Sequence, residues 1–231
     1  MINKNAPKNK GPEAVSKQAK IYIVDDHPIF REGLAGIINQ QPNLTVCGQA
    51  DNASTAFSEI PHAKPDVVIT DITLNGKSGL ELLKDLHSVQ PSLPVLVISM
   101  HDEVLYAERV LRAGGRGYIM KQEGPENIVK AIAKVLSGHV YLSGAMAAAF
   151  LDQISQTKPK GKTSEIEKLT DREFEVVRHI GQGKTSHDVA RDLHLSIKTV
   201  HAHCANIRQK LGLKTGHALI HFASRWVSSN G

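Results

Sequence analysis

Two cysteines are all that the 231 residues contain, and Cys47 and Cys204 lie far apart in the chain. Neither a disulfide framework nor a cysteine zinc site can be built from them, so a reducing cytoplasmic setting is expected. No apolar run approaches the roughly 18 residues of a membrane span. The N-terminal segment has no apolar core before Ile21, which argues against a signal peptide. No GxGxxG or Walker A motif follows an expected strand, which argues against a dinucleotide or P-loop nucleotide enzyme.

Charge is distributed unevenly along the chain, although the formal net value is only +5. Residues 20–140 carry 11 Lys and Arg against 14 Asp and Glu, whereas residues 168–231 carry 10 against 5, together with seven histidines. An acidic body joined to a basic, histidine-rich end suggests that only the C-terminal part meets a polyanion such as DNA.

Composition divides the chain into four segments. Residues 1–19 are rich in Lys, Asn and Pro without periodicity, and we expect them to form a disordered basic arm. Residues 20–138 alternate strand and helix patterns, residues 139–168 are typical of a partly helical linker with a polar stretch at 155–164, and residues 169–231 return to helical patterns. Two folded domains joined by a linker are therefore expected.

Residues 20–138 contain five short apolar segments, each followed by apolar residues at helical spacing. We expect strands at 21–24, 44–47, 67–71, 95–99 and 117–120, and helices at 28–38, 53–60, 79–89, 103–113 and 125–136. Five consecutive strand–helix units predict an α/β fold with a five-stranded, parallel, doubly wound sheet of the flavodoxin-like type.

Polar residues follow the expected strands where these end. Asp25 and Asp26 follow the first strand, Asp71 the third and Lys121 the fifth, and Ser99 ends the fourth. The carboxyl ends of parallel strands share one edge of a sheet, where ligands and chemistry gather. Three crowded carboxylates repel one another, so a cation is required among them, and Mg²⁺ suits oxygen ligands. With Mg²⁺ and a lysine beside it, Asp71 could accept a phosphoryl group.

Other interpretations of these residues stay open on the pattern alone. A single strand-ending Asp is more often a turn or cap residue, and a single Lys more often a solvated charge. An α/β enzyme with an Asp nucleophile, such as a phosphatase, would need a substrate pocket and a second catalytic acid, for which the sequence offers no motif. A phosphorylated adaptor that binds protein would lack salt-dependent affinity for DNA.

The order of these motifs resembles the receiver domain of bacterial response regulators over about residues 20–138. The resemblance implies that Asp71 is the residue that is phosphorylated. It also implies that Asp26, Asp71 and the main-chain carbonyl of Thr73 bind Mg²⁺ directly, and that Asp25 acts through water.

The same resemblance assigns roles to residues further along the chain. It implies that Ser99 hydrogen-bonds the phosphoryl group, that Lys121 pairs with it, and that Tyr118 swings inward as Ser99 shifts. The loop at 74–79 departs from the family's usual sequence, because Asn75 stands where a proline is common and a lysine is added. This departure bears on how rigid the loop is and how long the phosphoryl group lasts.

The helical patterns after residue 169 form four short units. The third begins at Ser196 and carries one apolar stripe at spacings of three and four, made of Ile197, Val200, Cys204, Ile207 and Leu211. Small and polar residues on its other face suit entry into the major groove of DNA, and the short helix before it completes a helix-turn-helix. An amphipathic surface helix in a small bundle is the alternative interpretation of the same pattern.

Residues 169–227 also resemble the LuxR-type helix-turn-helix domain, through the segments Leu-Thr-Asp-Arg-Glu at 169–173, Gly-Lys-Thr at 183–185, Lys-Thr-Val at 198–200 and Lys-Leu-Gly at 210–212. The resemblance implies contacts with bases from His201, Ala202 and Ala205. It implies contacts with phosphates from Lys184, Lys198 and Thr199.

Through both resemblances the chain is identified as a member of the NarL/FixJ class of response regulators. This implies a cytoplasmic, DNA-binding transcription factor that a partner histidine kinase phosphorylates in the presence of Mg²⁺. It also implies a homodimer on promoter DNA when phosphorylated, no membrane partner, and no enzyme activity beyond slow self-dephosphorylation.

Overall fold

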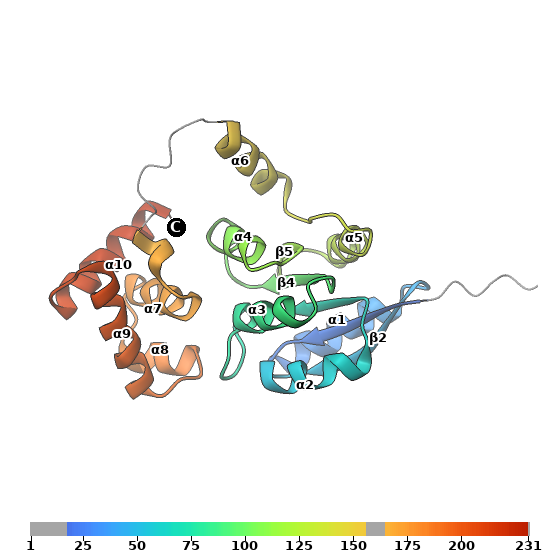
Figure 1. The fold of residues 1–231 in the computed structure, drawn as a ribbon, viewed down its shortest axis with the longest axis horizontal. Helices are drawn as coiled ribbons and strands as arrows, with labels where there is room; N and C mark the ends of the chain where they lie inside the picture. Colours follow the sequence, from blue (N-terminus) through green and yellow to red (C-terminus); the bar gives the residue numbers. More distant parts are fainter. Residues whose placement is uncertain (1–17, 156–164, 231) are drawn as a thin grey trace, which may run out of the picture.

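The structure, a computed structural model, describes residues 18–155 and 165–230. Its N-terminal half is built on five parallel strands in the order β2-β1-β3-β4-β5 (Figure 1). These strands are β1 (Ala19–Val24), β2 (Leu44–Ala50), β3 (Val67–Thr70), β4 (Val95–Ser99) and β5 (Gly117–Met120). Every residue of β3 and β4 is buried, because helices cover both faces of a parallel sheet.

Five helices cover the two faces of the sheet. They are α1 (Pro28–Asn39), α2 (Ala53–Ala63), α3 (Gly79–Val89), α4 (Glu103–Arg112) and α5 (Pro125–Leu136). Successive strand residues point to opposite faces: Ile21 and Ile23 pack with α1 and α5, whereas Tyr22 and Val24 pack with α2, α3 and α4. The expected doubly wound parallel α/β fold is confirmed.

α2 and β2 both run past the ends that the sequence predicted. α2 continues past its expected end at Ile60, through Pro61, to Ala63. A proline in the last turn removes one backbone donor, and the Lys64 N–H still reaches the carbonyl of Ile60 at 3.0 Å. The helix ends where Lys64 adopts a left-handed φ of 49°. β2 extends to Ala50 because β1 pairs with it over its whole length.

The expected linker contains α6 (Gly144–Ser155) and a short 3₁₀ helix at Glu165–Lys168. Residues 1–17 of the expected basic arm and residues 156–164 of the polar stretch lie outside the described residues. Within the ranges that are described, no helix combines the length and the hydropathy needed to cross a membrane.

The C-terminal helices pack around apolar side chains that are continuous with the core on one face of the sheet. They are α7 (Asp171–Gly181), α8 (Ser186–Asp192), α9 (Ile197–Leu211) and α10 (Gly216–Asn230), the last longer than expected. The Ser196 hydroxyl caps α9 by accepting from the Thr199 N–H at 3.0 Å, and Gly212 ends it with a φ of 66° that favours glycine. Of the predicted apolar stripe, Val200 and Ile207 are buried and Cys204 and Leu211 are half-buried, whereas Ile197 in the first turn is exposed.

Candidate functional site

Asp71 lies at the carboxyl edge of the sheet, directly after β3 and beside the residues that follow β1. The Asp71 N–H bonds to the Val24 carbonyl at 2.9 Å, which aligns the two strand ends. The Lys121 Nζ lies 2.7 Å from a carboxylate oxygen of Asp71 and 2.7 Å from one of Asp25. The structure therefore brings Asp25, Asp71 and Lys121 together, as the sequence predicted.

Burial dominates the electrostatics of this group. Asp71 is only 4% exposed, and loss of solvation raises its pKa, although the Lys121 ammonium works in the opposite direction. Burial also acts to lower the pKa of Lys121, but the carboxylates of Asp71 and Asp25 outweigh it and the pKa is raised. At neutral pH the lysine is therefore held as a cation between two carboxylates.

Asp26 completes the acidic group. One of its two carboxylate oxygens, Oδ1, lacks a hydrogen-bond donor within the described part of the chain. Ligand atoms of Asp25, Asp26, His27 and Asp71 lie within 4.8 Å of one another. The Asp26 side chain is 3% exposed, and its Oδ1 accepts no hydrogen bond from the described residues, although His27 Nδ1 lies 2.8 Å away. A buried carboxylate oxygen left in this state fits a hard divalent cation with oxygen ligands. The sequence analysis missed His27, whose place directly after the acidic pair was the available signal.

Ser99 and Tyr118 are buried next to this edge. Tyr118 is fully buried, and its hydroxyl donates a hydrogen bond to the carbonyl of His101 at 2.7 Å. The Ser99 hydroxyl accepts from the N–H of the same residue, His101, at 3.5 Å. Tyr118 therefore already lies inward in this structure.

His101, which the sequence analysis missed, links the edge of the sheet to the C-terminal helices. Its Nε2 lies 2.9 Å from the Thr73 hydroxyl, and its Nδ1 lies 2.8 Å from a guanidinium nitrogen of Arg178 in α7. Burial and the Arg178 charge lower the pKa of His101 to about 3. The ring is therefore neutral, with Nδ1 accepting from Arg178 and Nε2–H donating to Thr73. Its position two residues after Ser99 was the only sequence signal.

The loop at 74–79 is tied to its surroundings despite lacking the expected proline. Asn75 forms an isolated bridge with Asn52, and the carbonyl of Gly76 accepts from Arg172 at 2.9 Å. The loop returns so close to the site that a Cβ on Gly79 would lie 1.7 Å from the carbonyl oxygen of Asp71. Glycine is therefore required where this loop enters α3.

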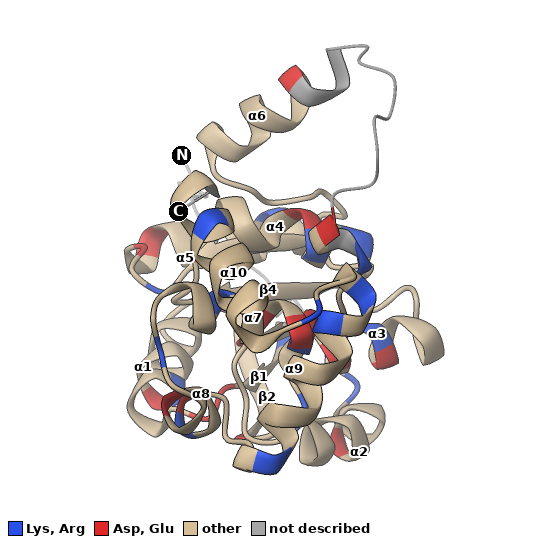
Figure 2. Ribbon diagram, turned by 90° about the vertical axis from the view of Figure 1, so that its left-hand side faces the viewer, with Lys and Arg blue, Asp and Glu red and all other residues tan. Residues whose placement is uncertain are grey.

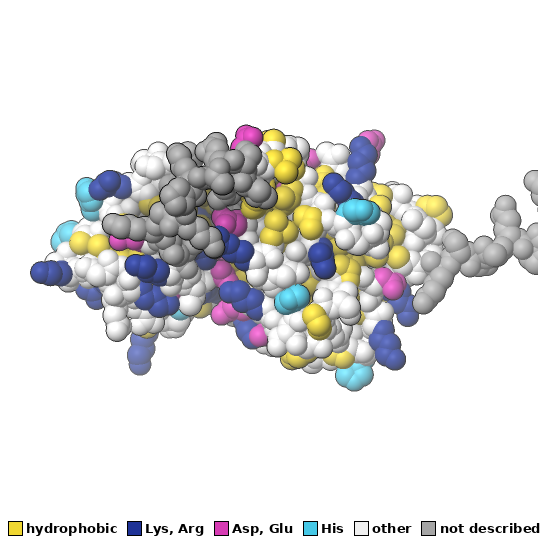
Figure 3. Space-filling model, turned by 45° about the horizontal axis from the view of Figure 1, so that its top comes forward, with side chains coloured by type: hydrophobic (Ala, Val, Ile, Leu, Met, Phe, Trp, Pro, Cys, Tyr) yellow, Lys and Arg dark blue, Asp and Glu magenta, His cyan; other side chains and the backbone are white. Residues whose placement is uncertain are grey.

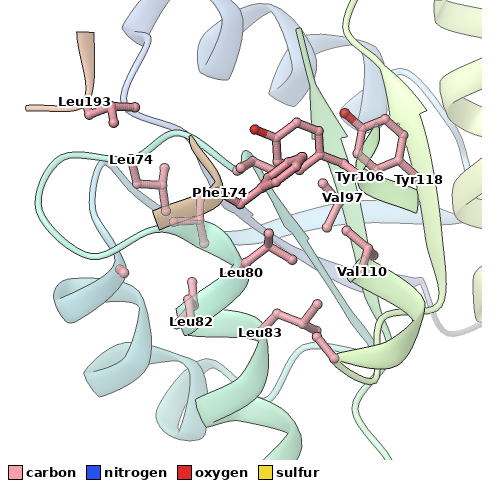
Figure 4. Close-up of a cluster of buried hydrophobic side chains, with 14 of the residues drawn as sticks. Leu74, Leu80, Leu82, Leu83, Val97, Tyr106, Val110, Tyr118, Phe174 and Leu193 are labelled. Carbon is pink, nitrogen blue, oxygen red and sulfur yellow. The ribbon is translucent and has the colours of Figure 1, made fainter. Parts of the chain in front are cut away.

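The first C-terminal helix, α7, is buried along most of its length, between the other C-terminal helices and the sheet domain. Asp171 at its start pairs with Lys84 at 2.6 Å and with Arg109 at 3.1 Å. Phe174 inserts among Tyr106, Leu80 and Leu83 and meets Tyr106 edge-on at 5.3 Å (Figure 4). These polar and apolar contacts form one continuous seam between the two halves of the chain.

The face of α9 that the sequence assigned to DNA is exposed. Lys198, His201, Ala202 and Ala205 are exposed on one helix, and Figure 2 views this end of the molecule. The Thr199 hydroxyl lies 2.7 Å from that of Ser196. Lys184 stands apart from them in the loop before α8, where its ammonium pairs with Asp192 at 2.8 Å.

The surface differs between the two halves. In Figure 3, Lys and Arg side chains are spread over the end built from the C-terminal helices, while hydrophobic side chains gather over the sheet domain. Exposed apolar residues of that domain include Ile29, Met100 and Val104. The basic end is therefore the part suited to meet a polyanion.

Comparison with known proteins gives matches in two separate parts of the chain. Residues 21–133 match the response regulator receiver domain, and residues 167–223 match the bacterial regulatory proteins of the luxR family. The chain is 35% identical over 208 residues to the Fimbriae Z protein of Salmonella typhimurium, covering 90% of this chain and 97% of that one.

Solved structures of response regulators are also similar to this chain. A LuxR-family two-component response regulator from Aurantimonas shares 31% identity over 61% of this chain and 100% of its own, with a TM-score of 0.57. RcsB from Salmonella enterica serovar Typhimurium, bound to promoter DNA in the presence of the phosphomimetic BeF₃⁻, shares 26% identity over 90% of this chain and 100% of its own, with a TM-score of 0.58. The chain belongs to the LuxR family of two-component response regulators, which are DNA-binding regulators rather than catalytic enzymes.

Proposed function

We propose that this response regulator is switched by phosphorylation of Asp71 by a partner histidine kinase, and that phosphorylation controls its dimerisation and binding to promoter DNA. The observation that carries the proposal is the buried Asp71 carboxylate with the Lys121 ammonium at 2.7 Å, beside the acidic pair Asp25 and Asp26. In this setting the Asp71 carboxylate can act as a nucleophile. The Lys121 ammonium is already placed to stabilise the negative charge that develops on a phosphoryl group.

The chemistry follows from the arrangement of these side chains. A carboxylate oxygen of Asp71 attacks the phosphorus of a phosphohistidine, the P–N bond breaks, and the imidazole nitrogen retains the bonding electrons. Asp26, Asp71 and the Thr73 carbonyl would hold Mg²⁺ directly, with Asp25 acting through water. When bound, Mg²⁺ neutralises charge on the phosphoryl oxygens. Lys121 would then move its ammonium from the carboxylate to a phosphoryl oxygen.

We propose that Ser99 and Tyr118 transmit the effect of Asp71 phosphorylation to the neighbouring elements. A hydrogen bond from Ser99 to the phosphoryl group would move the end of β4, and with it His101, whose carbonyl accepts from Tyr118. The His101 ring would then be drawn away from Arg178 of α7. This step would loosen the seam between the two halves of the chain.

DNA contact is assigned to α9 and its neighbours. His201, Ala202 and Ala205 would meet base edges, and Lys198, Thr199 and Lys184 would meet phosphates. A dimer would present two such helices to half-sites about one helical turn apart. We assign residues 20–138 to the receiver domain, 139–168 to the linker and 169–231 to the DNA-binding domain.

The proposal is tested by phosphorylation of wild-type and Asp71→Asn protein. Each is incubated with Mg²⁺ and a small-molecule phosphodonor such as acetyl phosphate, and the products are separated on a phosphate-affinity gel. Wild-type protein is expected to give a retarded band that alkali abolishes and that Asp71→Asn lacks, since an acyl phosphate is readily hydrolysed by base. A retarded band from Asp71→Asn would place the modification on another residue.

A further inference from the structure

The turn of the helix-turn-helix reaches the acidic group at the edge of the sheet. His194, between α8 and α9, places its Nε2 3.4 Å from Oδ2 of Asp26. Asp26 belongs to the oxygen-rich group with Asp25 and Asp71. A residue of the DNA-binding domain thus contacts one of the carboxylates to which the proposed function assigns a metal ion.

The backbone holds His194 in this position. His194 has a φ of 51°, in the left-handed region that non-glycine residues seldom adopt. Its N–H bonds to the carbonyl of Arg191 at 3.2 Å, and the next N–H, of Leu195, bonds to Ala190 at 2.8 Å. The turn is therefore fixed on the end of α8, which holds the backbone of His194 beside Asp26.

The three carboxylates are not equivalent. Lys121 pairs with Asp25 and Asp71, which leaves Asp26 as the carboxylate that faces the DNA-binding domain. Mg²⁺ binds oxygen at about 2.0–2.1 Å and keeps several of its waters. The Asp26 oxygen that is short of partners among the described residues is Oδ1, and the His194 ring lies 3.4 Å from Oδ2 of the same carboxylate. We therefore expect the waters of an ion on Asp26 to crowd the His194 ring.

We propose that His194 and a divalent cation compete for Asp26, so that binding of the cation alone weakens the contact between the DNA-binding helices and the receiver domain. The inference rests on the proposed function in taking the ion to be the Mg²⁺ of phosphoryl transfer. The coupling is reciprocal: the factor by which the bound ion weakens the contact is also the factor by which the contact weakens binding of the ion. Removal of the ring therefore strengthens cation binding.

The chain carries its own reporter of the seam. Trp226 in α10 is the sole tryptophan of the sequence, and it meets Phe174 edge-on at 5.3 Å. Phe174 in turn meets Tyr106 of the receiver domain. Trp226 also lines a cavity of about 660 Å³ together with Lys84 and Arg109 of that domain. A change in the seam is therefore expected to alter the fluorescence of Trp226.

The test uses the full chain with MgCl₂ and no phosphodonor. His194→Asn is the variant of choice, because asparagine tolerates a left-handed φ and its shorter side chain withdraws from Asp26. His194→Gly removes the ring without backbone strain and provides a second variant. His187→Ala, on the exposed side of α8, is the matched control. Thermal unfolding of each variant verifies that it is folded.

Calorimetric titration with Mg²⁺ is expected to give a Kd about fivefold to tenfold lower for both His194 variants than for wild-type and His187→Ala protein, at the lower end of the usual range of coupling between sites. Mg²⁺ is expected to change the Trp226 emission of wild-type protein more than that of either His194 variant. An unchanged Kd would overturn the competition, and a raised Kd would instead make His194 a ligand of the ion.

The outcome is separable from that of the proposed function. Phosphorylation of Asp71 is read on a gel, whereas the competition is read from Mg²⁺ binding in the absence of a phosphodonor. A lowered Kd in the His194 variants would therefore stand even if Asp71→Asn protein were still modified. Absence of Mg²⁺ binding to every variant would overturn the competition and the assigned metal together.

Discussion

Arg178 of α7 donates a hydrogen bond to Nδ1 of His101 at 2.8 Å, and this contact joins the DNA-binding helices to the end of β4. The same histidine accepts from the Tyr118 hydroxyl through its carbonyl and stacks on Tyr106 at 5.0 Å. His101 thus contacts the proposed switch residues on one side and the DNA-binding domain on the other, and a movement of β4 is expected to reach α7 through it.

Replacement of Arg178 by Met is expected to loosen the seam without unfolding either domain. The change leaves Nδ1 of His101 without a donor in a buried place, which costs about 1–3 kcal/mol. Trp226 emission should shift, and the thermal midpoint should fall by several degrees. Arg225→Met, on the exposed side of α10, is the matched control and should leave both measurements unchanged. Equal behaviour of the two variants would contradict a coupling role for Arg178.

Acidification is expected to destabilise the folded chain through His179. Burial and neighbouring cations lower the pKa of this buried histidine to about 4, against an ordinary value near 6.5. Below pH 6.5, His179 takes up a proton in the unfolded chain but stays neutral in the folded chain. The free energy of unfolding therefore decreases as the pH falls from about 6.5 to 4. The loss should be roughly 1–2 kcal/mol at pH 5.

Urea unfolding at pH 7.5, 6.0 and 5.0 in EDTA measures this dependence. His179→Gln cannot take up the proton and should show a flatter profile than wild-type protein, whereas the exposed His187→Ala should follow wild type. If the profiles of wild-type and His179→Gln protein were parallel, the protons would have to be assigned to other groups.

Alanine at Gly79 is expected to disturb the site directly. Its Cβ would lie 1.7 Å from the carbonyl oxygen of Asp71, so the backbone after β3 must move. We expect a loss of stability of about 1–3 kcal/mol and a phosphorylation rate lowered by at least about tenfold. Gly36→Ala, an exposed position in α1 with nothing within 4 Å of the added Cβ, should instead be neutral or stabilising by about 0.5–1 kcal/mol. Similar effects of the two changes would argue against the close approach.

Lys121→Met is expected to lower the rate of phosphorylation of Asp71. The change leaves two buried carboxylates without the ammonium that lies 2.7 Å from each. Both the stability at neutral pH and the initial rate with acetyl phosphate should fall, and Mg²⁺ should restore more stability than it adds to wild-type protein, since a cation is missing. Lys130→Met, exposed on α5, is the control. A wild-type rate in Lys121→Met would remove Lys121 from the site.

Lys198→Ala is expected to weaken DNA binding without a change in sequence preference. Lys198 is exposed at the start of α9, and a lost phosphate contact lowers the slope of log K against log salt by about 1. Fluorescence anisotropy with a labelled duplex at several salt concentrations measures that slope. The exposed Lys130→Ala on α5 should bind as wild type does, and a slope shared by wild-type and Lys198→Ala protein would exclude the contact.

The sequence by itself determined the elements and the order of the site residues. β-branched strands alternate with helices of period 3.6, and prolines or cap residues such as Pro28 and Ser196 mark where helices begin. These signals are local, and they predicted the α/β class, the strand-end carboxylates and the exposed face of α9. The predicted end of α2 at Ile60 was wrong, because the helix continues through Pro61 to Ala63 and the Lys64 N–H still bonds to the Ile60 carbonyl.

Only the tertiary structure decided how the two halves meet. Arg172, Glu175 and Arg178 carry charged side chains of a kind that is seldom buried in proteins, yet all three are buried in α7. His101 and His194 likewise have ordinary neighbours in the sequence and acquire their partners, Arg178 and Asp26, from distant segments. Periodicity describes one element at a time, whereas burial of a charged side chain depends on a complementary group that another element supplies. The contacts of His101 and His194 with distant residues therefore could not be predicted from local sequence patterns.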